Sequence, residues 1–180
     1  MSVEYKSPVL CIVGPTAVGK TAMAIELASR LNGEIIGLDS RQIYKGLEIG
    51  TAQPTATEIS KIRHHLIGIR DLKNPISAGE YARLVWKAVS EITERKNQPI
   101  ICGGAGLYFR AVREGIFRDS VSALGIRKRL NKEYEGLGGE YLLNRLRDID
   151  PDYAEIVHPN NQKRLVRALE IYEATGRPPT

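Results

Sequence analysis

Cysteine, histidine and long apolar runs are scarce in this sequence of 180 residues. The two cysteines, Cys11 and Cys102, each lie in a short apolar run, so we expect core residues on strands rather than a disulfide framework or a metal site. The three histidines lack the cysteine or acidic neighbours of a zinc site. No apolar run is long enough to span a membrane, and residues 1–7 lack the apolar stretch of a signal peptide, which predicts a cytoplasmic protein.

The composition suits a folded protein with a modest positive charge. Hydrophobic residues make up 42% of the chain, enough to fill the core of one domain or of a core with a small appendage. The formal net charge of +5 is compatible with an anionic partner such as a nucleic acid. It is equally compatible with a basic protein that binds no polyanion.

The first part of the chain has the pattern of a strand, a helix and a second strand. Residues 8–13 form a short β-branched run, residues 21–31 have apolar side chains at helical spacing, and residues 34–38 form another apolar run. A strand–helix–strand unit predicts a parallel sheet covered by helices.

A phosphate-binding motif lies between the first strand and the helix. Residues 14–21 fit G-x-x-x-x-G-K-[ST], which in this context predicts a P-loop. Its glycines let backbone N–H groups curl around phosphate oxygens, and Lys20 and the helix N-terminus add positive potential. The motif indicates a di- or triphosphate without identifying a nucleotide. The predicted phosphate-binding residues are Gly14, Pro15, Thr16, Ala17, Val18, Gly19, Lys20 and Thr21, and the Thr21 hydroxyl is the predicted protein ligand of a Mg²⁺ ion.

More strands and helices are predicted in the next part of the chain. One strand is predicted over 65–69 and another over 100–102. Ser77 and Glu80 have the spacing of a capping box and predict the start of a helix, and a shorter helix is predicted over 107–114.

No β-rich run appears beyond Phe117. Helical patterns recur there over 123–135, 140–149 and 161–175. We therefore predict an α/β fold, a P-loop NTPase-like parallel sheet flanked by helices, over residues 1–117. A small all-helical domain, appended to or inserted into that core, is predicted over residues 118–180.

Polar residues mark the edge of the sheet where the predicted strands end. Asp39 follows the second strand, at the edge where open α/β sheets bind ligands, and can be a magnesium ligand, a general base or the cap of a turn. Ser40 and Gln42 have donors and acceptors suited to a purine edge. The glycine-rich segment 103–106 lies at the same edge and is either a site of close ligand approach or a plain strand-to-helix turn.

Two clusters of basic residues mark the helical part. Arg127 lies among Lys128, Arg129 and Lys132, and Lys163, Arg164 and Arg167 recur at helical spacing opposite an apolar stripe. Such clusters suit a phosphate backbone, although a solvated helix face is the more usual explanation.

Together these segments resemble the tRNA dimethylallyltransferase (tRNA isopentenyltransferase) family, from Val9 to Pro178. The resemblance is carried by GPTAVGKT at 14–21, DSRQIYKGLEIGTAQP at 39–54, HHLIGI at 64–69, GGAGLYFRAV at 103–112 and HPNNQKRLVRALEIYEATG at 158–176. The P-loop is shared with many proteins, whereas the second and last segments are far more specific to this family.

The resemblance implies transfer of a dimethylallyl group from dimethylallyl diphosphate to N6 of an adenine next to the tRNA anticodon, position 37, with release of diphosphate. Thr16, Lys20 and Thr21 would contact the diphosphate and its Mg²⁺. Thr16 and Asp39 would be the catalytic residues, Asp39 as the base for N6. The residues that would bind tRNA are Asp39, Ser40, Arg41, Gln42, Ala105, Arg127, Lys163, Arg164 and Arg167.

The sequence departs from the family pattern at a few positions. Ala105 stands where threonine is usual, Asn161 where aspartate is common, and residues 122–125 replace a Pro-Asp turn. The family also continues well past Thr180. We therefore expect a folded P-loop core that binds diphosphate, little tRNA modification by this chain alone, and an exposed apolar patch that favours dimers or aggregates.

Other functions fit part of the sequence. A small-molecule or nucleoside kinase would share the P-loop and Asp39 but would consume ATP. A prenyltransferase acting on free adenine nucleotides would accept AMP instead of tRNA. A non-catalytic RNA- or nucleotide-binding remnant would bind without turnover.

Overall fold

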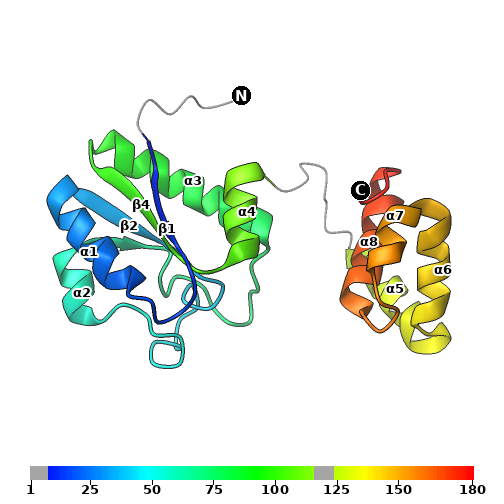
Figure 1. Ribbon diagram of the computed structural model, residues 1–180. Coiled ribbons are helices and arrows are strands. Elements are labelled where there is room, and N and C mark those ends of the chain that lie inside the picture. The colour runs from blue at the N-terminus through cyan, green and yellow to red at the C-terminus, as the bar shows by residue number, and fades with distance from the viewer. Residues whose placement is uncertain (1–7, 116–123) are drawn as a thin grey trace. The chain divides into compact units, whose positions relative to one another are not determined.

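The computed structural model describes residues 8–115 and 124–180 of a chain that forms two compact units, Met1–Ile116 and Phe117–Thr180 (Figure 1). The first unit contains β1 (Leu10–Val13), α1 (Lys20–Leu31), β2 (Gly33–Leu38), α2 (Ala56–Lys61), β3 (His64–His65), α3 (Ala78–Glu94), β4 (Gln98–Gly103) and α4 (Gly106–Glu114). The second contains α5 (Leu124–Leu137), α6 (Gly139–Ile149), α7 (Pro151–Ile156) and α8 (Gln162–Thr175). The expected domain boundary at Phe117 lies outside the described residues.

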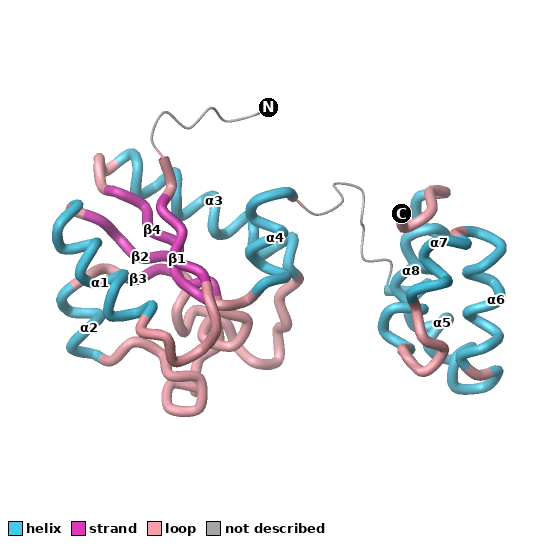
Figure 2. Tube along the Cα trace, in the orientation of Figure 1, coloured by secondary structure: helices cyan, strands magenta, loops and turns pink. Residues whose placement is uncertain are grey.

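The sheet of the first unit has four parallel strands in the order β1–β4–β2–β3, which confirms the predicted α/β fold with a parallel sheet flanked by helices. Val13 at the end of β1 and Leu38 at the end of β2 are both register partners of Gly103 at the end of β4. These strands therefore end at the same level, and the longer loops of the unit gather at that edge (Figure 2).

Side chains of the inner strands alternate between the two faces of the sheet. Ile36, Leu38 and Ile101 pack against α3 and α4, whereas Ile35 and Ile100 pack against α1 on the other face. Figure 1 shows α1 and the pair α3 and α4 on opposite sides of the strands. This layering fixes the strand ends, and with them the loops that follow.

Strand β1 lies at the edge of the sheet, and its burial differs from the sequence expectation. Both cysteines lie on strands, as predicted. Cys11 is exposed, so the prediction that it is a core residue is wrong, whereas Cys102 is half-buried and packs against the core beside α1. Val13, on the same face of β1 as Cys11, is 47% exposed. Helices α3 and α4 pack against the inner strands, and Cys11 and Val13 on the edge strand stay exposed.

The strand predicted over 65–69 is shorter than expected. It contains only His64 and His65, because Leu66 has a left-handed φ of 62° and Gly68 a φ of 58°, which end the extended conformation. Helices α2 and α7, which are too short to show a clear periodicity, were not predicted.

The expected capping box of α3 is only half formed. The Ser77 hydroxyl accepts a hydrogen bond from the Glu80 backbone N–H at 3.2 Å. The Glu80 carboxylate, which a capping box would use for the Ser77 backbone, forms an ion pair with Arg70 at 2.8 Å instead. This ion pair links the start of α3 to the loop before it.

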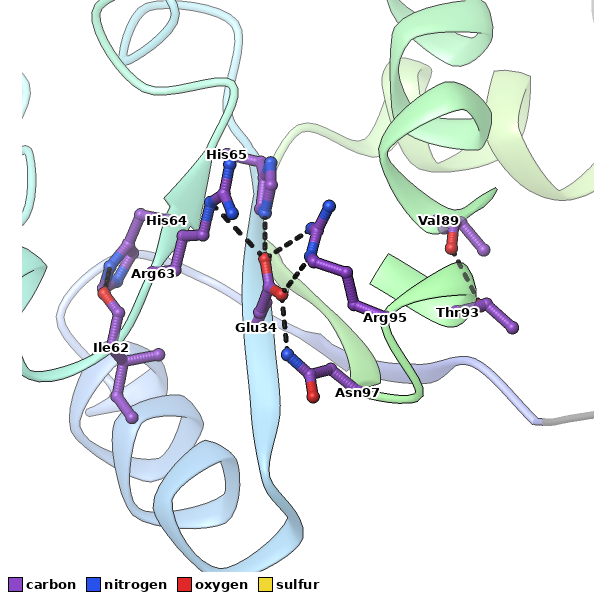
Figure 3. Close-up of polar contacts among 9 residues, drawn as sticks. All are labelled: Glu34, Ile62, Arg63, His64, His65, Val89, Thr93, Arg95 and Asn97. Carbon is purple, nitrogen blue, oxygen red and sulfur yellow. Dashed lines mark hydrogen bonds and ion pairs between the residues drawn. The ribbon is translucent and has the colours of Figure 1, made fainter. Parts of the chain in front are cut away.

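A buried carboxylate links neighbouring strands at the other end of the sheet, where β2 begins (Figure 3). Glu34, 4% exposed at the start of β2, accepts hydrogen bonds from Arg95 Nε at 2.9 Å, Arg95 Nη2 at 2.8 Å and Asn97 Nδ2 at 2.8 Å. His65 Nε2 lies 2.6 Å from the same carboxylate. Burial raises the pKa of Glu34, but the hydrogen bonds from Arg95, His65 and Asn97 and the charge of Arg95 outweigh it and lower the pKa to about 2.

The helical unit has a core of its own. Helices α5, α6 and α8 bury a cluster of leucines, Leu130, Leu142, Leu146, Leu165 and Leu169. Asp150, 3% exposed, caps α7 by accepting from the Tyr153 backbone N–H at 3.1 Å. Asn161 caps α8 by accepting from the Arg164 backbone N–H at 3.3 Å, so this departure from the family pattern keeps the capping oxygen. No helix in the described ranges is both long and apolar enough to cross a membrane.

Candidate phosphate and base site

The P-loop curls between β1 and α1. Ala17 and Gly19 have left-handed φ values of 67° and 83°, and Gly19 is the N-cap of α1. The Lys20 ammonium turns back and donates a hydrogen bond to the Pro15 carbonyl. The cation is thus held over the curve of the loop, where it is available to an anion that competes with this carbonyl.

Glycines bring the three strand ends into contact. A Cβ on Gly103 would lie 2.0 Å from the Leu38 carbonyl oxygen, and a Cβ on Gly104 would lie 2.9 Å from the Gly14 carbonyl oxygen and 4.0 Å from Lys20 Nζ. The Gly104 and Ala105 N–H groups both donate to the Leu38 carbonyl at 3.2 Å. Gly103 and Gly104 therefore serve the close approach of the strand ends to one another.

Asp39 follows Leu38 directly and is half-buried. Its Oδ1 accepts hydrogen bonds from the Arg41 N–H at 2.8 Å and the Gln42 N–H at 3.2 Å, which makes it the cap of a turn. Its Oδ2 receives no hydrogen bond from the described part of the chain. The cap and the base, two of the alternatives for this residue, are thus compatible because they use different oxygens.

Two buried tyrosines that sequence reasoning did not assign to the site support this strand end. The Tyr81 hydroxyl donates to the Gly37 carbonyl at 2.5 Å, and the centroid of its ring lies 4.3 Å from that of the Tyr108 ring. Burial raises the pKa of both hydroxyls, and the negative charge of Asp39 raises it further. Tyr108 lies in the segment GGAGLYFRAV at 103–112, which is the one sequence signal that could have pointed to it.

The loop after Asp39 is held by two amide side chains. Gln42 Nε2 donates to the Thr51 carbonyl at 3.0 Å and to the Ala52 carbonyl at 2.9 Å. Gln53 Nε2 donates to the carbonyls of Gln42 and Tyr44, each at 2.9 Å. Gln42 therefore has its amide nitrogen engaged within the loop, whereas Ser40 and Arg41 are exposed beside Asp39.

The protein residues near the P-loop would supply few metal ligands. The described residues contain no group of three or more histidine, cysteine, aspartate or glutamate side chains that could hold a metal ion. Thr21 lies in the first turn of α1, next to the loop. A Mg²⁺ ion keeps several waters and is often held by one or two protein ligands plus substrate phosphates, so this poor donor set fits a metal that enters with a diphosphate.

The basic residues of the helical unit fall into two groups. Arg127 and Arg167 form ion pairs with Glu170, each at 2.8 Å. Lys163 and Arg164 are exposed in the first turn of α8, and no described acid pairs with them. Lys163 also borders an open hollow lined by His158, Asn160, Asn161 and Gln162.

Known proteins resemble this chain over nearly its whole length. The family model described as IPP transferase matches residues 42–180. The tRNA dimethylallyltransferase of Halorhodospira halophila is 45% identical over 172 residues, which are 96% of this chain and 56% of the relative. That of Roseiflexus sp. is 46% identical over 172 residues, 95% of this chain and 56% of the relative. The chain thus spans about half the length of the curated relatives it matches.

Solved structures agree with these relatives. A full-length tRNA isopentenylpyrophosphate transferase from Bacillus halodurans has a TM-score of 0.62 and 42% identity, covering 96% of this chain and 57% of that one. A eukaryotic dimethylallyltransferase acting on tRNA has a TM-score of 0.77 and 30% identity, covering 95% of this chain and 42% of that one. The family predicted from the sequence is confirmed, and the chain belongs to the IPP transferase family.

Proposed function

We propose that this chain forms the diphosphate-binding and base-bearing part of a tRNA dimethylallyltransferase. The reaction transfers a dimethylallyl group from dimethylallyl diphosphate to N6 of an adenine next to the tRNA anticodon, position 37, and releases diphosphate. The observation that carries the proposal is the convergence of Lys20, the glycine-rich turn and Asp39 at the strand ends around Gly103. The names of the relatives, which are tRNA dimethylallyltransferases, support the substrates.

The P-loop would hold the leaving group. A diphosphate in the curve of residues 14–21 would draw Lys20 away from the Pro15 carbonyl and accept hydrogen bonds from the N-terminal amides of α1. The exposed Thr16 hydroxyl would add a donor. An allylic carbon tolerates partial positive charge, so stabilising the charge that grows on the departing diphosphate lowers the barrier.

Mg²⁺ is part of the proposal through the donor set of the loop. When bound, the ion would neutralise charge on the diphosphate oxygens. Thr21 would be its protein ligand, and the diphosphate and water would supply the others, because no described acidic cluster is present.

Asp39 would take the proton of the attacking amine. An adenine amine is a poor nucleophile and must lose a proton as the C–N bond forms, which a carboxylate within hydrogen-bond reach can accept. Oδ1 holds the turn through Arg41 and Gln42, and Oδ2 is the oxygen left to act as the base. The adenine must leave its stack to reach this oxygen, which suits an anticodon-loop base.

The tRNA would be held by residues of both units. Ser40, Arg41 and Gln42 lie beside the proposed base, with Ala105 in the adjacent turn. In the helical unit Arg127, Lys163, Arg164 and Arg167 would contact the RNA backbone. A protein that modifies tRNA in this way would work in the cytoplasm.

A ligand-protection experiment tests the donor. We expect dimethylallyl diphosphate with Mg²⁺ to raise the melting temperature, pyrophosphate to compete with it, and Lys20→Ala to abolish the effect. Hydrolysis of ATP, or phosphate transfer from it, without any effect of the prenyl donor would favour a kinase. Mass spectrometry of tRNA and AMP after incubation with the donor then identifies the acceptor, and binding without transfer to either would indicate a non-catalytic remnant.

A further inference from the structure

Two arginines of the helical unit share one oxygen of a fully buried glutamate. Arg127 of α5 donates to Glu170 Oε2 from Nε at 3.0 Å and from Nη2 at 2.8 Å. Arg167, one turn before Glu170 on α8, donates to the same oxygen from Nη1 at 2.8 Å. The Glu170 side chain is 0% exposed, and its Oε1 has no hydrogen-bond partner.

The arginines keep unused donors at the surface. Their side chains are 40% and 33% exposed for Arg127 and Arg167, respectively. Arg127 retains Nη1, and Arg167 retains Nε and Nη2, and these groups have no hydrogen-bond partner within the described residues. Because both guanidinium groups contact one oxygen, they lie close together, at a separation that their like charges would oppose without Glu170.

Charge balance distinguishes the Glu170 cluster from an ordinary set of ion pairs between helices. Arg129 and Arg145 form a neighbouring ring of ion pairs with Glu133 and Glu173, in which two cations meet two anions and the net charge is zero. The Glu170 cluster has two cations and one anion, so 2 − 1 leaves a net charge of +1. The excess positive charge, with exposed N–H groups around it, is suited to a further anion.

The neighbouring residues extend this positive surface. Lys163 and Arg164 are exposed and lie one turn before Arg167 on α8, four and three residues away, and so on the same side of the helix. The cluster therefore lies at the end of a basic row that a phosphate backbone could follow.

We propose that Glu170 is a positioning residue that holds Arg127 and Arg167 together as a clamp for one backbone phosphate of tRNA. Glu170 does not itself contact the RNA, because its carboxylate is buried beneath the guanidinium groups. The proposal rests on the proposed function, in which this unit binds tRNA.

The effect of removing the negative charge tests the clamp. Glu170→Gln keeps the size and one acceptor of the side chain and raises the net charge of the protein by one. Charge alone would then strengthen RNA binding, whereas loss of the clamp weakens it. We expect affinity of the 180-residue chain for a fluorescent anticodon stem-loop RNA to fall about tenfold, the scale of one lost charge-assisted contact. The slope of log K against log salt should fall by about 0.7 or more.

Glu173→Gln is the matched control, since it removes the same charge from the same helix and breaks interhelical ion pairs of the balanced ring. It should leave the slope unchanged and binding equal or tighter. Equal or tighter binding by Glu170→Gln, with an unchanged slope, would overturn the clamp.

A double-mutant cycle covers the case in which Glu170→Gln fails to fold. Arg127→Gln and Arg167→Gln should weaken RNA binding by amounts that do not add in the double variant, because one phosphate is lost in each case. Additive losses would mean two independent contacts and no clamp. If the unsubstituted chain binds dimethylallyl diphosphate but no RNA, the tRNA-binding role of the chain and the clamp both fail, whereas RNA binding with a failed Glu170 test removes the clamp alone.

Discussion

Replacement of Glu34 by glutamine should destabilise the α/β unit in a way that depends on pH. The hydrogen bonds from Arg95, His65 and Asn97 and the charge of Arg95 outweigh burial and lower the pKa of Glu34 from its ordinary 4.5 to about 2. A difference of this size corresponds to about 3 kcal/mol of folding free energy, at about 1.4 kcal/mol per pKa unit. Glu34→Gln should therefore cost the unit up to about 3 kcal/mol at neutral pH.

The sign of the pH effect follows from the direction of the shift. Because the folded-state pKa lies below the unfolded-state value of 4.5, the stabilisation is fully present above that pH and is lost as the pH falls toward 2. Between pH 5 and pH 3, the difference in unfolding free energy between the unsubstituted chain and Glu34→Gln should narrow by about 2 kcal/mol.

Urea unfolding followed by tryptophan fluorescence can measure this gap in one unit of the chain. Trp86 is the single tryptophan, lies in α3, and donates a hydrogen bond to the Val112 carbonyl at 3.2 Å. Its emission therefore reports on the unfolding of the α/β unit, in which it lies. A gap that stays constant from pH 5 to pH 3 would refute the reasoning, since the glutamine variant would then lose shape complementarity rather than a charge.

Three further substitutions, one of them with a matched control, test the candidate site. Asp39→Asn keeps the Oδ1 that caps the turn, so folding and diphosphate protection should persist. In a complete version of the enzyme, prenyl transfer measured by single-turnover mass spectrometry should fall about a hundredfold. Gly103→Ala puts a Cβ 2.0 Å from the Leu38 carbonyl oxygen and should abolish thermal protection by dimethylallyl diphosphate, whereas Gly106→Ala, with nothing within 4 Å, should not. Tyr81→Phe removes the hydroxyl that donates to the Gly37 carbonyl and should lower the free energy of unfolding, measured in urea, by about 1–3 kcal/mol. An unchanged urea midpoint would mean that the hydroxyl does not support this part of β2.

The sequence was informative where the chemistry is local. The P-loop pattern and the position of Asp39 at a strand end follow from short stretches with a known backbone consequence, and the structure brings the two together. Which strand lies at the sheet edge depends on contacts between distant segments, and so the exposure of Cys11 could not be predicted.

Long-range contacts also determine which partners the basic residues of the helical unit have. Helical spacing correctly placed Arg167 away from the apolar stripe. However, Arg167 shares Glu170 with Arg127, which lies 43 positions before Glu170 in the sequence. Periodicity along one helix carries no information about such a pairing. The engagement of the Gln42 nitrogen within its own loop is another fact that depends on a folded turn rather than on residue type.

Strand β2 is fastened at both of its ends. Glu34 holds the amino end through side chains from two neighbouring segments, and the Leu38 carbonyl at the other end accepts two backbone N–H groups of the glycine-rich turn. A shift of the strand by one residue would move Asp39 by about 3.3 Å and turn alternate side chains to the wrong face. Asp39 is therefore placed when the sheet forms. In the proposed function, Lys20 is the group that would change its partner, from the Pro15 carbonyl to the diphosphate.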